Sequence, residues 1–179
     1  MAYNIIAENE DYTIVSDYQT IYRKSDKYQT EAQLEKELIK TLTEQGYDYL
    51  AIHKEQDLVD NLRVQLQRLN NYTFTDSEWK RFFDDVIANQ NEGIEAKTTK
   101  IQEDHIQVLK RDNGETKNIY LIDKKNIHNN YLQVINQYEE EQGNYDTRYD
   151  VSILVNGLPL VHIELKRRGV QPDWPLSER

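Results

Sequence analysis

No cysteine occurs among the 179 residues of the chain. Disulfide bridges, thiolate metal sites and cysteine nucleophiles are therefore excluded for this sequence. Long apolar runs are missing as well, since none approaches the roughly 18 residues that a membrane-spanning helix needs. The first residues, MAYNIIAENEDYTIV, lack the basic and apolar regions of a signal peptide. We therefore expect a cytoplasmic protein that contacts no membrane.

Two further shortages concern nucleotides and nucleic acids. None of the six glycines is followed by lysine, so the sequence holds no phosphate-binding P-loop and no ATPase site of that kind. Acidic residues outnumber basic residues by 32 to 22, and the net charge of −10 argues against a protein that coats nucleic acid generally. The densest basic run is LKRRG (residues 165–169), which makes Arg167 and Arg168 candidate contacts to DNA.

Three helices are predicted in the first half of the chain, whose overall hydrophobic content of 37% is enough for a folded domain. TEAQLEKELIKTLTEQGY predicts a helix over residues 31–45, because it opens with a capping box and is followed by a glycine. Leucines at helical spacing predict a second helix over about 55–70, and another capping box opens a third that reaches about residue 90. We interpret the apolar stripes of all three as core packing.

Strands dominate the pattern from residue 93 onward. HIQVLKRDNGETKNIYLID alternates on both sides of an Asn-Gly pair and predicts a hairpin, and NNYLQVINQY predicts another strand. YDYLAI (residues 47–52) is expected to form a short strand, EEEQGN an exposed turn, and the first 25 residues an irregular arm or short edge strand. The order predicts an α+β or mixed α/β domain, in which helices flank a central sheet dominated by antiparallel hairpins.

One strand-like stretch, YDVSILVNGLPLVHIELKRR (residues 149–168), carries charged residues among apolar ones. Side chains on a strand alternate between its two faces. Two apolar triplets must therefore pack on one side of the sheet: Val151, Ile153 and Val155, and Val161, Ile163 and Leu165. Asp150, Glu164 and Lys166 then project together from the opposite side.

Placing both apolar triplets on one side of the sheet restricts the turn between the two strands. Asp150 has to face either Glu164 or Lys166, and a plain two-residue turn at the Asn-Gly pair would scatter the charged cluster. We therefore expect an odd-length loop around residues 156–159, or a glycine bulge.

The chemistry of the cluster suits a hard divalent cation. Two facing carboxylates repel each other unless a positive charge lies between them, and Mg²⁺ or Mn²⁺ could be held by Asp150, Glu164 and the backbone carbonyl of Leu165. Lys166 would orient or deprotonate a water, or stabilise charge that develops on a phosphorane. These groups are what metal-assisted phosphodiester hydrolysis requires. The plain alternative is a solvated strand face with a cross-strand ion pair worth under about 1 kcal/mol.

The wider string RYDVSILVNGLPLVHIELKRRG resembles the nuclease segment of the restriction (motor) subunit of type I restriction-modification enzymes. The spacing of Asp150, Glu164 and Lys166 matches the PD-(D/E)xK signature of that subunit's N-terminal domain, with Tyr149 before the aspartate. TEAQLEKELIKTLTEQGY and NLRVQLQRLN also resemble the family's N-terminal region, and the likeness extends over most of residues 25–170.

The resemblance implies a metal-dependent endonuclease domain with a restriction-endonuclease-like core over residues 1–170. Its cofactor would be Mg²⁺ or Mn²⁺, and its partners double-stranded DNA and the methylase and specificity subunits. ATP would serve only the motor of the full-length parent subunit. Related nucleases also carry a glutamate on the first core helix that joins the metal site directly or through water. Glu35 is the best match, Glu31 and Glu37 are fallbacks, and an ordinary surface glutamate is the alternative for each.

The sequence departs from the family pattern in two respects. The motor lobes are absent, and the family's nuclease domain continues after the ELKRRG strand into a helix that bears glutamine and tyrosine. Here the tail reads VQPDWPLSER, in which Pro172 and Pro175 forbid a regular helix. We expect a truncated nuclease domain with an atypical tail at residues 171–179.

Two interpretations from other classes compete with the nuclease. The chain could be a catalytically silent docking protein or an acidic mimic of DNA, or it could be a structural fragment with a degenerate site. A mimic has no use for the LKRR run beside an acidic cluster. His162 lies on the site face, and we expect it to fill space beside Leu160 rather than to act in catalysis.

Overall fold

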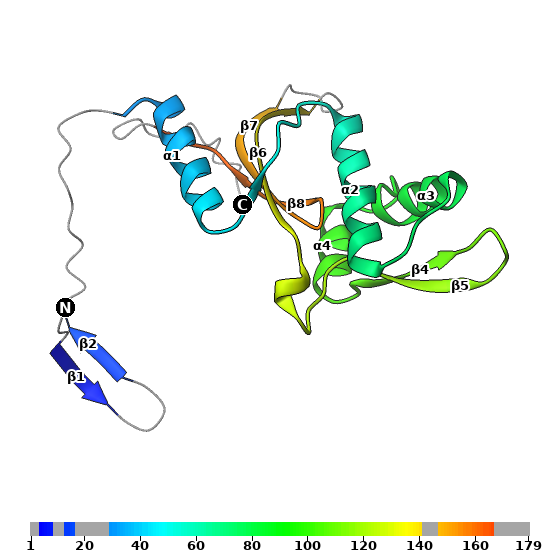
Figure 1. Cartoon of the computed structure of the whole chain (residues 1–179), viewed down its shortest axis with the longest axis horizontal. Helices are drawn as coiled ribbons and strands as arrows, with labels where there is room; N and C mark the ends of the chain where they lie inside the picture. Colours follow the sequence, from blue (N-terminus) through cyan, green and yellow to red (C-terminus); the bar gives the residue numbers. More distant parts are fainter. Residues whose placement is uncertain (1–3, 9–12, 17–28, 141–146, 167–179) are drawn as a thin grey trace.

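The computed structural model describes residues 4–8, 13–16, 29–140 and 147–166 (Figure 1). Helices and strands mix along the chain, as predicted for an α+β domain. The helical elements are α1 (Glu31–Glu44), α2 (Glu55–Asn70), α3 (Asp76–Phe82), the π-helical turn η1 (Phe83–Ile87), α4 (Ile94–Gln102) and the 3₁₀ turn η2 (Ile127–Asn129). The strands are β1 (Asn4–Glu8), β2 (Thr13–Ser16), β3 (Asp48–Tyr49), β4 (Ile106–Lys110), β5 (Thr116–Tyr120), β6 (Leu132–Glu140), β7 (Thr147–Val155) and β8 (Leu158–Ile163).

The described strands form a central four-stranded sheet and two separate hairpins. The central sheet has the order β3-β6-β7-β8, in which β3 runs parallel to β6 and the other neighbours are antiparallel. β4 and β5 form the predicted hairpin, and β1 and β2 form a second one where we expected an irregular arm or edge strand. The expected strand over residues 47–52 shortens to β3. Of the expected EEEQGN turn, the first two residues belong to β6, and the rest lies outside the described residues.

The helices begin and end where local chemistry dictates. Thr30 caps α1 through the predicted capping box, in which its hydroxyl accepts from the Gln33 N–H and the Gln33 side chain accepts from the Thr30 N–H. Gly46 follows with φ of 95°, a left-handed conformation that ends the helix at little cost. α2 matches its predicted bounds. The predicted third helix is α3 continued by η1, where the backbone widens to a π-helical turn.

α4 was not predicted. None of its residues is buried, and Ile94 at its start is 82% exposed. The segment therefore lacks the apolar stripe from which an amphipathic helix is recognised in a sequence.

Helices cover both faces of the central sheet. Neighbouring residues Val134 and Ile135 of β6 are both buried but point to opposite sides. Val134 packs with Leu42 of α1, whereas Ile135 packs in a cluster that Leu58 of α2 joins. Figure 1 shows α1 and α2 on opposite sides of the β6–β7 ribbon. The sheet face that carries α1 therefore differs from the one that carries α2.

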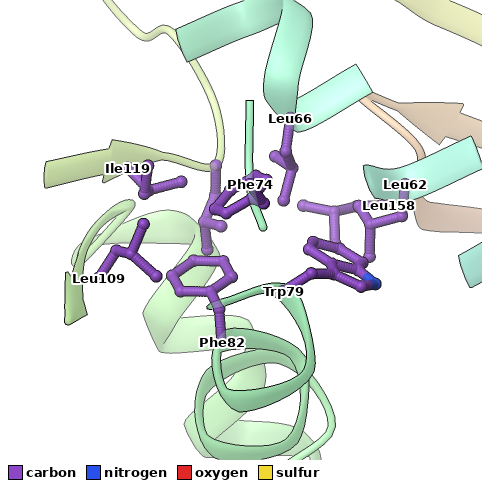
Figure 2. Packing of buried hydrophobic residues seen from close by; sticks show 9 residues of the cluster. Leu62, Leu66, Phe74, Trp79, Phe82, Leu109, Ile119 and Leu158 are labelled. Atoms are coloured by element: carbon purple, nitrogen blue, oxygen red, sulfur yellow. The ribbon is translucent and has the colours of Figure 1, made fainter. Parts of the chain in front are cut away.

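The largest core cluster lies away from the α1 side. It joins α2, α3, the β4–β5 hairpin and the β7–β8 turn through nine buried residues: Leu62, Leu66, Phe74, Trp79, Phe82, Leu109, Ile119, Leu121 and Leu158 (Figure 2). The rings of Phe74 and Phe82 stack with centroids 5.7 Å apart. This cluster anchors the turn between β7 and β8 to the helices, and that turn positions the charged stretch.

The β7–β8 turn corrects one expectation and explains how the register arises. Asn156 and Gly157 form a two-residue turn with φ of 52° and 82°, the left-handed pair that tight hairpins use. Next to the turn Leu154 pairs with Pro159, but further out Ile153 pairs with Val161. Leu160 is thus an extra residue on β8. A bulge at Leu160, rather than an odd-length loop or a bulge at a glycine, restores the same-face match.

Within the part of the chain that the structure describes, no helix is both long and apolar enough to cross a membrane.

Candidate active site

Asp150 of β7 is bound to the chain that leaves β8. The main-chain N–H of Leu165 donates a hydrogen bond of 2.7 Å to Oδ2 of Asp150. Val151 pairs with Ile163, so the next residues outward are Asp150 on β7 and Glu164, just past the end of β8. The hairpin therefore brings the aspartate and the Glu-Leu-Lys segment together.

Glu164 and Lys166 form an ion pair beside Asp150. Nζ of Lys166 lies 2.5 Å from Oε1 of Glu164, and their side chains are 41% and 50% exposed. The hydrogen bond and charge of Glu164 raise the pKa of Lys166 above its ordinary 10.5, and the charges of Glu31 and Asp150 add to the effect. The ammonium group is accordingly protonated at neutral pH, and it lies within the field of three carboxylates.

The apolar side of the hairpin packs against α1. Val151 is fully buried in a cluster with Leu42, while Ile153, Ile163 and Leu165 are partly buried against it. Val161, which belongs to one of the two predicted apolar triplets, is 45% exposed, so β8 is more exposed than the alternation indicates. β8 is an edge strand of the central sheet, which leaves its side chains more accessible.

The opposite side of β7 is not a continuous solvent face. Leu154 is buried with Ile52 on the α2 side of the sheet. Ser152 is also buried, and its hydroxyl hydrogen-bonds to Nδ1 of His162 at 2.8 Å. The His162 ring stacks on Tyr149 with centroids 4.0 Å apart. His162 is thus held in place by Ser152 and Tyr149.

Glu35 lies in α1, and two amides of β6 bind it. Its carboxylate accepts from Nδ2 of Asn136 at 2.5 Å and from Nε2 of Gln137 at 2.6 Å. Asn136 pairs with Val151 and Tyr138 pairs with Tyr149, so Gln137 stands across from Asp150 between these two pairs. Glu35 therefore reaches the neighbourhood of Asp150 through Gln137.

The two fallback glutamates point in different directions. Glu31, at the exposed start of α1, is close enough to Lys166 for its charge to raise the pKa of that lysine. Glu37 accepts a hydrogen bond of 2.8 Å from the Gln29 side chain. Of the other predicted site residues, Arg167 and Arg168 lie outside the described residues.

The donor set bears on which metal the site could take. Among the described residues, no three His, Cys, Asp or Glu side chains gather closely enough to hold an ion. A cation here would depend on the Asp150 and Glu164 carboxylates, main-chain oxygen and water. Mg²⁺ is suited to such a set, because it keeps several waters and commonly uses only one or two carboxylates. Gln137, whose backbone stands across from Asp150, has a buried Oε1 that finds no hydrogen-bond partner in the described part of the chain. No motif in the sequence marks Gln137.

Two carboxyls outside the candidate site, Glu78 and Asp112, have lowered pKa values that structural contacts explain. Glu78 is 3% exposed, and burial raises the pKa of its carboxyl. Hydrogen bonds from the Tyr72 hydroxyl and the Asp112 and Thr75 N–H groups outweigh burial and lower the pKa overall. Asp112 accepts from side chains of α3 and its cap. These acids tie α3 to the β4–β5 hairpin and are fully engaged there.

The described chain is an α+β domain in which two carboxylates and a lysine gather at one hairpin. Comparison with known families shows which family the chain belongs to. The family described as type I restriction enzyme R protein N terminus matches residues 28–174, and the chain belongs to this family.

Curated relatives carry names that agree with this family. An endonuclease subunit of a type I restriction enzyme from Escherichia coli is 45% identical over 166 residues, which is 92% of this chain and 53% of the relative. A subunit of the same description from Staphylococcus saprophyticus is 38% identical over 148 residues, 80% of this chain and 15% of the relative. One from Staphylococcus aureus strain COL is 37% identical over 150 residues, with the same coverage. The chain thus spans about half of the first relative and a small part of the other two.

Proposed function

We propose that the chain is the nuclease domain of a type I restriction enzyme R subunit, with a PD-(D/E)xK core that hydrolyses phosphodiester bonds of DNA. The observation that carries the proposal is the hydrogen bond from Leu165 to Asp150, because it unites the aspartate with the Glu164–Lys166 pair. Family membership supports the same assignment. We further propose that the nuclease domain extends to about residue 170, and that residues 171–179 are an atypical tail.

The residues divide the work by their chemistry. Asp150, Glu164 and the carbonyl of Leu165 would hold Mg²⁺ or Mn²⁺, with Glu35 behind them. Such a cation supplies Lewis-acid polarisation of a phosphoryl oxygen when it is bound. The carboxylates fix its position, and they also set the orientation of the Lys166 ammonium relative to the scissile phosphate.

Lys166 is best suited to act as a cation. Glu164 raises the pKa of Lys166, so in the chain without bound metal this side chain is an ammonium group at neutral pH. A protonated ammonium 2.5 Å from Glu164 is placed to stabilise negative charge on the phosphoryl oxygens in the transition state. Arg167 and Arg168 would contact the neighbouring DNA backbone.

A longer R subunit would supply the ATP-driven delivery of DNA, for which this sequence holds no P-loop. We propose that DNA reaches the site after ATP-driven translocation by motor domains beyond this chain, in a complex with methylase and specificity subunits. The net charge of −10 repels DNA, so the isolated chain should bind it weakly and cut it poorly or not at all. An acidic docking protein or DNA mimic would share the charge but would give no response to divalent metal.

Thermal unfolding with and without metal tests the proposal directly. Mg²⁺ or Mn²⁺ should raise the melting temperature of the wild-type chain, because an ion that binds only the folded state stabilises it. Asp150→Asn should abolish the increase. Asp84→Asn is a matched control, since it removes the same charge from a surface ion pair with Lys80 in another part of the chain. An unchanged melting temperature in the wild type would reject the metal-dependent nuclease and favour the docking protein.

A further inference from the structure

The contacts of Glu35 fix the orientation of two amide side chains. A carboxylate can only accept hydrogen bonds, so the amide nitrogen of each partner must face it. For Asn136 the other end of the amide is also engaged, because its Oδ1 accepts from the Tyr49 hydroxyl at 2.8 Å. The Asn136 amide is thus satisfied at both ends.

Gln137 differs from Asn136 at this point. Its Nε2 donates to Glu35 at 2.6 Å, which turns Oε1 away from the carboxylate. Oε1 is buried and accepts no hydrogen bond from the described part of the chain. A buried acceptor without a donor is unfavourable and uncommon, so its presence needs an explanation.

The backbone of Gln137 is also unusual. Its φ is 55°, in the left-handed region, although it is not glycine and stands inside β6. The ladder between β6 and β7 has pairs on both sides of this position, but none joins Gln137 to Asp150. Regular sheet pairing therefore does not account for this conformation. Strained backbone of this kind concentrates where a side chain must be aimed at a ligand.

We propose that Gln137 is a positioning residue of the metal site. Its Oε1 accepts a hydrogen bond from a water in the hydration shell of the divalent cation, while its Nε2 holds Glu35. The inference rests on the proposed function, because the cation is the one assigned to Asp150 and Glu164. Mg²⁺ and Mn²⁺ retain waters whose O–H groups need acceptors, and Gln137 stands across from Asp150 with an acceptor to offer. The role of Glu35 thereby becomes indirect, through Gln137 and water.

The test measures metal affinity rather than activity. Gln137→Gly removes both the acceptor and the donor to Glu35, and glycine suits a φ of 55°, so the variant should still fold. Its dissociation constant for Mn²⁺, measured by calorimetry or by the electron paramagnetic resonance of unbound Mn²⁺, should rise roughly 10- to 100-fold, as for other outer-shell partners. Asn71→Gly is the matched control: Asn71 has φ of 45° at the end of α2, and its replacement should leave the affinity unchanged.

The outcomes separate this inference from the proposed function. Wild-type affinity in Gln137→Gly, together with loss of binding in Asp150→Asn, would overturn the role of Gln137 and leave the metal site standing. Absence of Mn²⁺ binding in the wild type would overturn both. If the glycine variant does not fold, Gln137→Asn serves instead, because asparagine tolerates the left-handed region but withdraws the carbonyl by one methylene. The same loss of affinity is expected, and an unchanged affinity would again count against Gln137.

Discussion

Leu165 donates its main-chain N–H to the carboxylate of Asp150 across 2.7 Å. The bond joins the segment just after β8 to a residue of β7 that lies 15 positions earlier in the sequence. It depends on the register of the hairpin, which the two-residue turn alone does not set. The extra residue at Leu160 supplies the missing step between the turn and the outer strands. The candidate site is therefore a product of the bulge as well as of the three charged residues.

Replacing Lys166 should separate DNA cleavage from ATP hydrolysis. In a full-length R subunit that carries this domain and is assembled with its methylase and specificity partners, Lys166→Ala should lower the rate of DNA cleavage by roughly 100-fold or more, as expected for loss of a group that stabilises the transition state. ATP hydrolysis by the same assembly should persist, because Lys166 belongs to the nuclease site. Both rates are measured on one preparation.

Lys80→Ala provides the control for that experiment, since Lys80 forms a surface ion pair with Asp84 in α3 and η1. It should preserve both activities. Cleavage at the wild-type rate in Lys166→Ala would show that the lysine is not catalytic, and the nuclease assignment of this hairpin would then be wrong.

Gly157 should be far less replaceable than Gly46. An added Cβ at Gly157 would lie 2.6 Å from Cα of Leu62, which belongs to the main chain of α2, and the residue has φ of 82°. Gly46 has φ of 95° but open space around the added atom. Gly157→Ala is expected to lower the free energy of unfolding by roughly 2–5 kcal/mol, and Gly46→Ala by about 1 kcal/mol. Urea unfolding of both variants checks the difference, and equal losses would mean that the turn does not press on α2 as described.

Much of the fold could be predicted because its signals are local. The capping box at Thr30 and the Asn-Gly pair in the β4–β5 hairpin each depend on residues close in sequence. α4 was not predicted because none of its residues is fully buried, and hydrophobic periodicity reports burial. The π-helical turn within the third predicted helix also leaves no pattern in the sequence, since the same apolar residues serve either helix type.

The site was predictable only in part, because some of its residues are brought together by contacts between segments far apart in the sequence. Alternation along β7 and β8 places Asp150 and Glu164 on neighbouring positions, and the structure brings them together; their catalytic roles stay predictions. Gln137 could not be foreseen, because its place opposite Asp150 depends on the pairing of β6 with β7 and its orientation depends on α1. The left-handed backbone at this residue is likewise set by tertiary contacts, since glutamine has no preference for it.

Asp112 should make the stability of the chain depend on pH in the acid range. Hydrogen bonds from Ser77, Thr75 and Arg81 lower the pKa of its carboxyl from 3.8 to about 2. A carboxyl whose pKa is lower in the folded state adds stability that is complete above 3.8 and is lost as the pH falls through about 2. The wild type should therefore exceed Asp112→Asn in melting temperature at pH 6, and the gap should close between these two values. The gap isolates Asp112 because the other carboxyl groups titrate in both proteins.

Ser77→Ala removes the largest contribution to the lowered pKa of Asp112, so in that background the gap in melting temperature should close at a higher pH. A gap that is independent of pH from 6 down to about 2 would show that the Asp112 carboxylate is not stabilised by these donors.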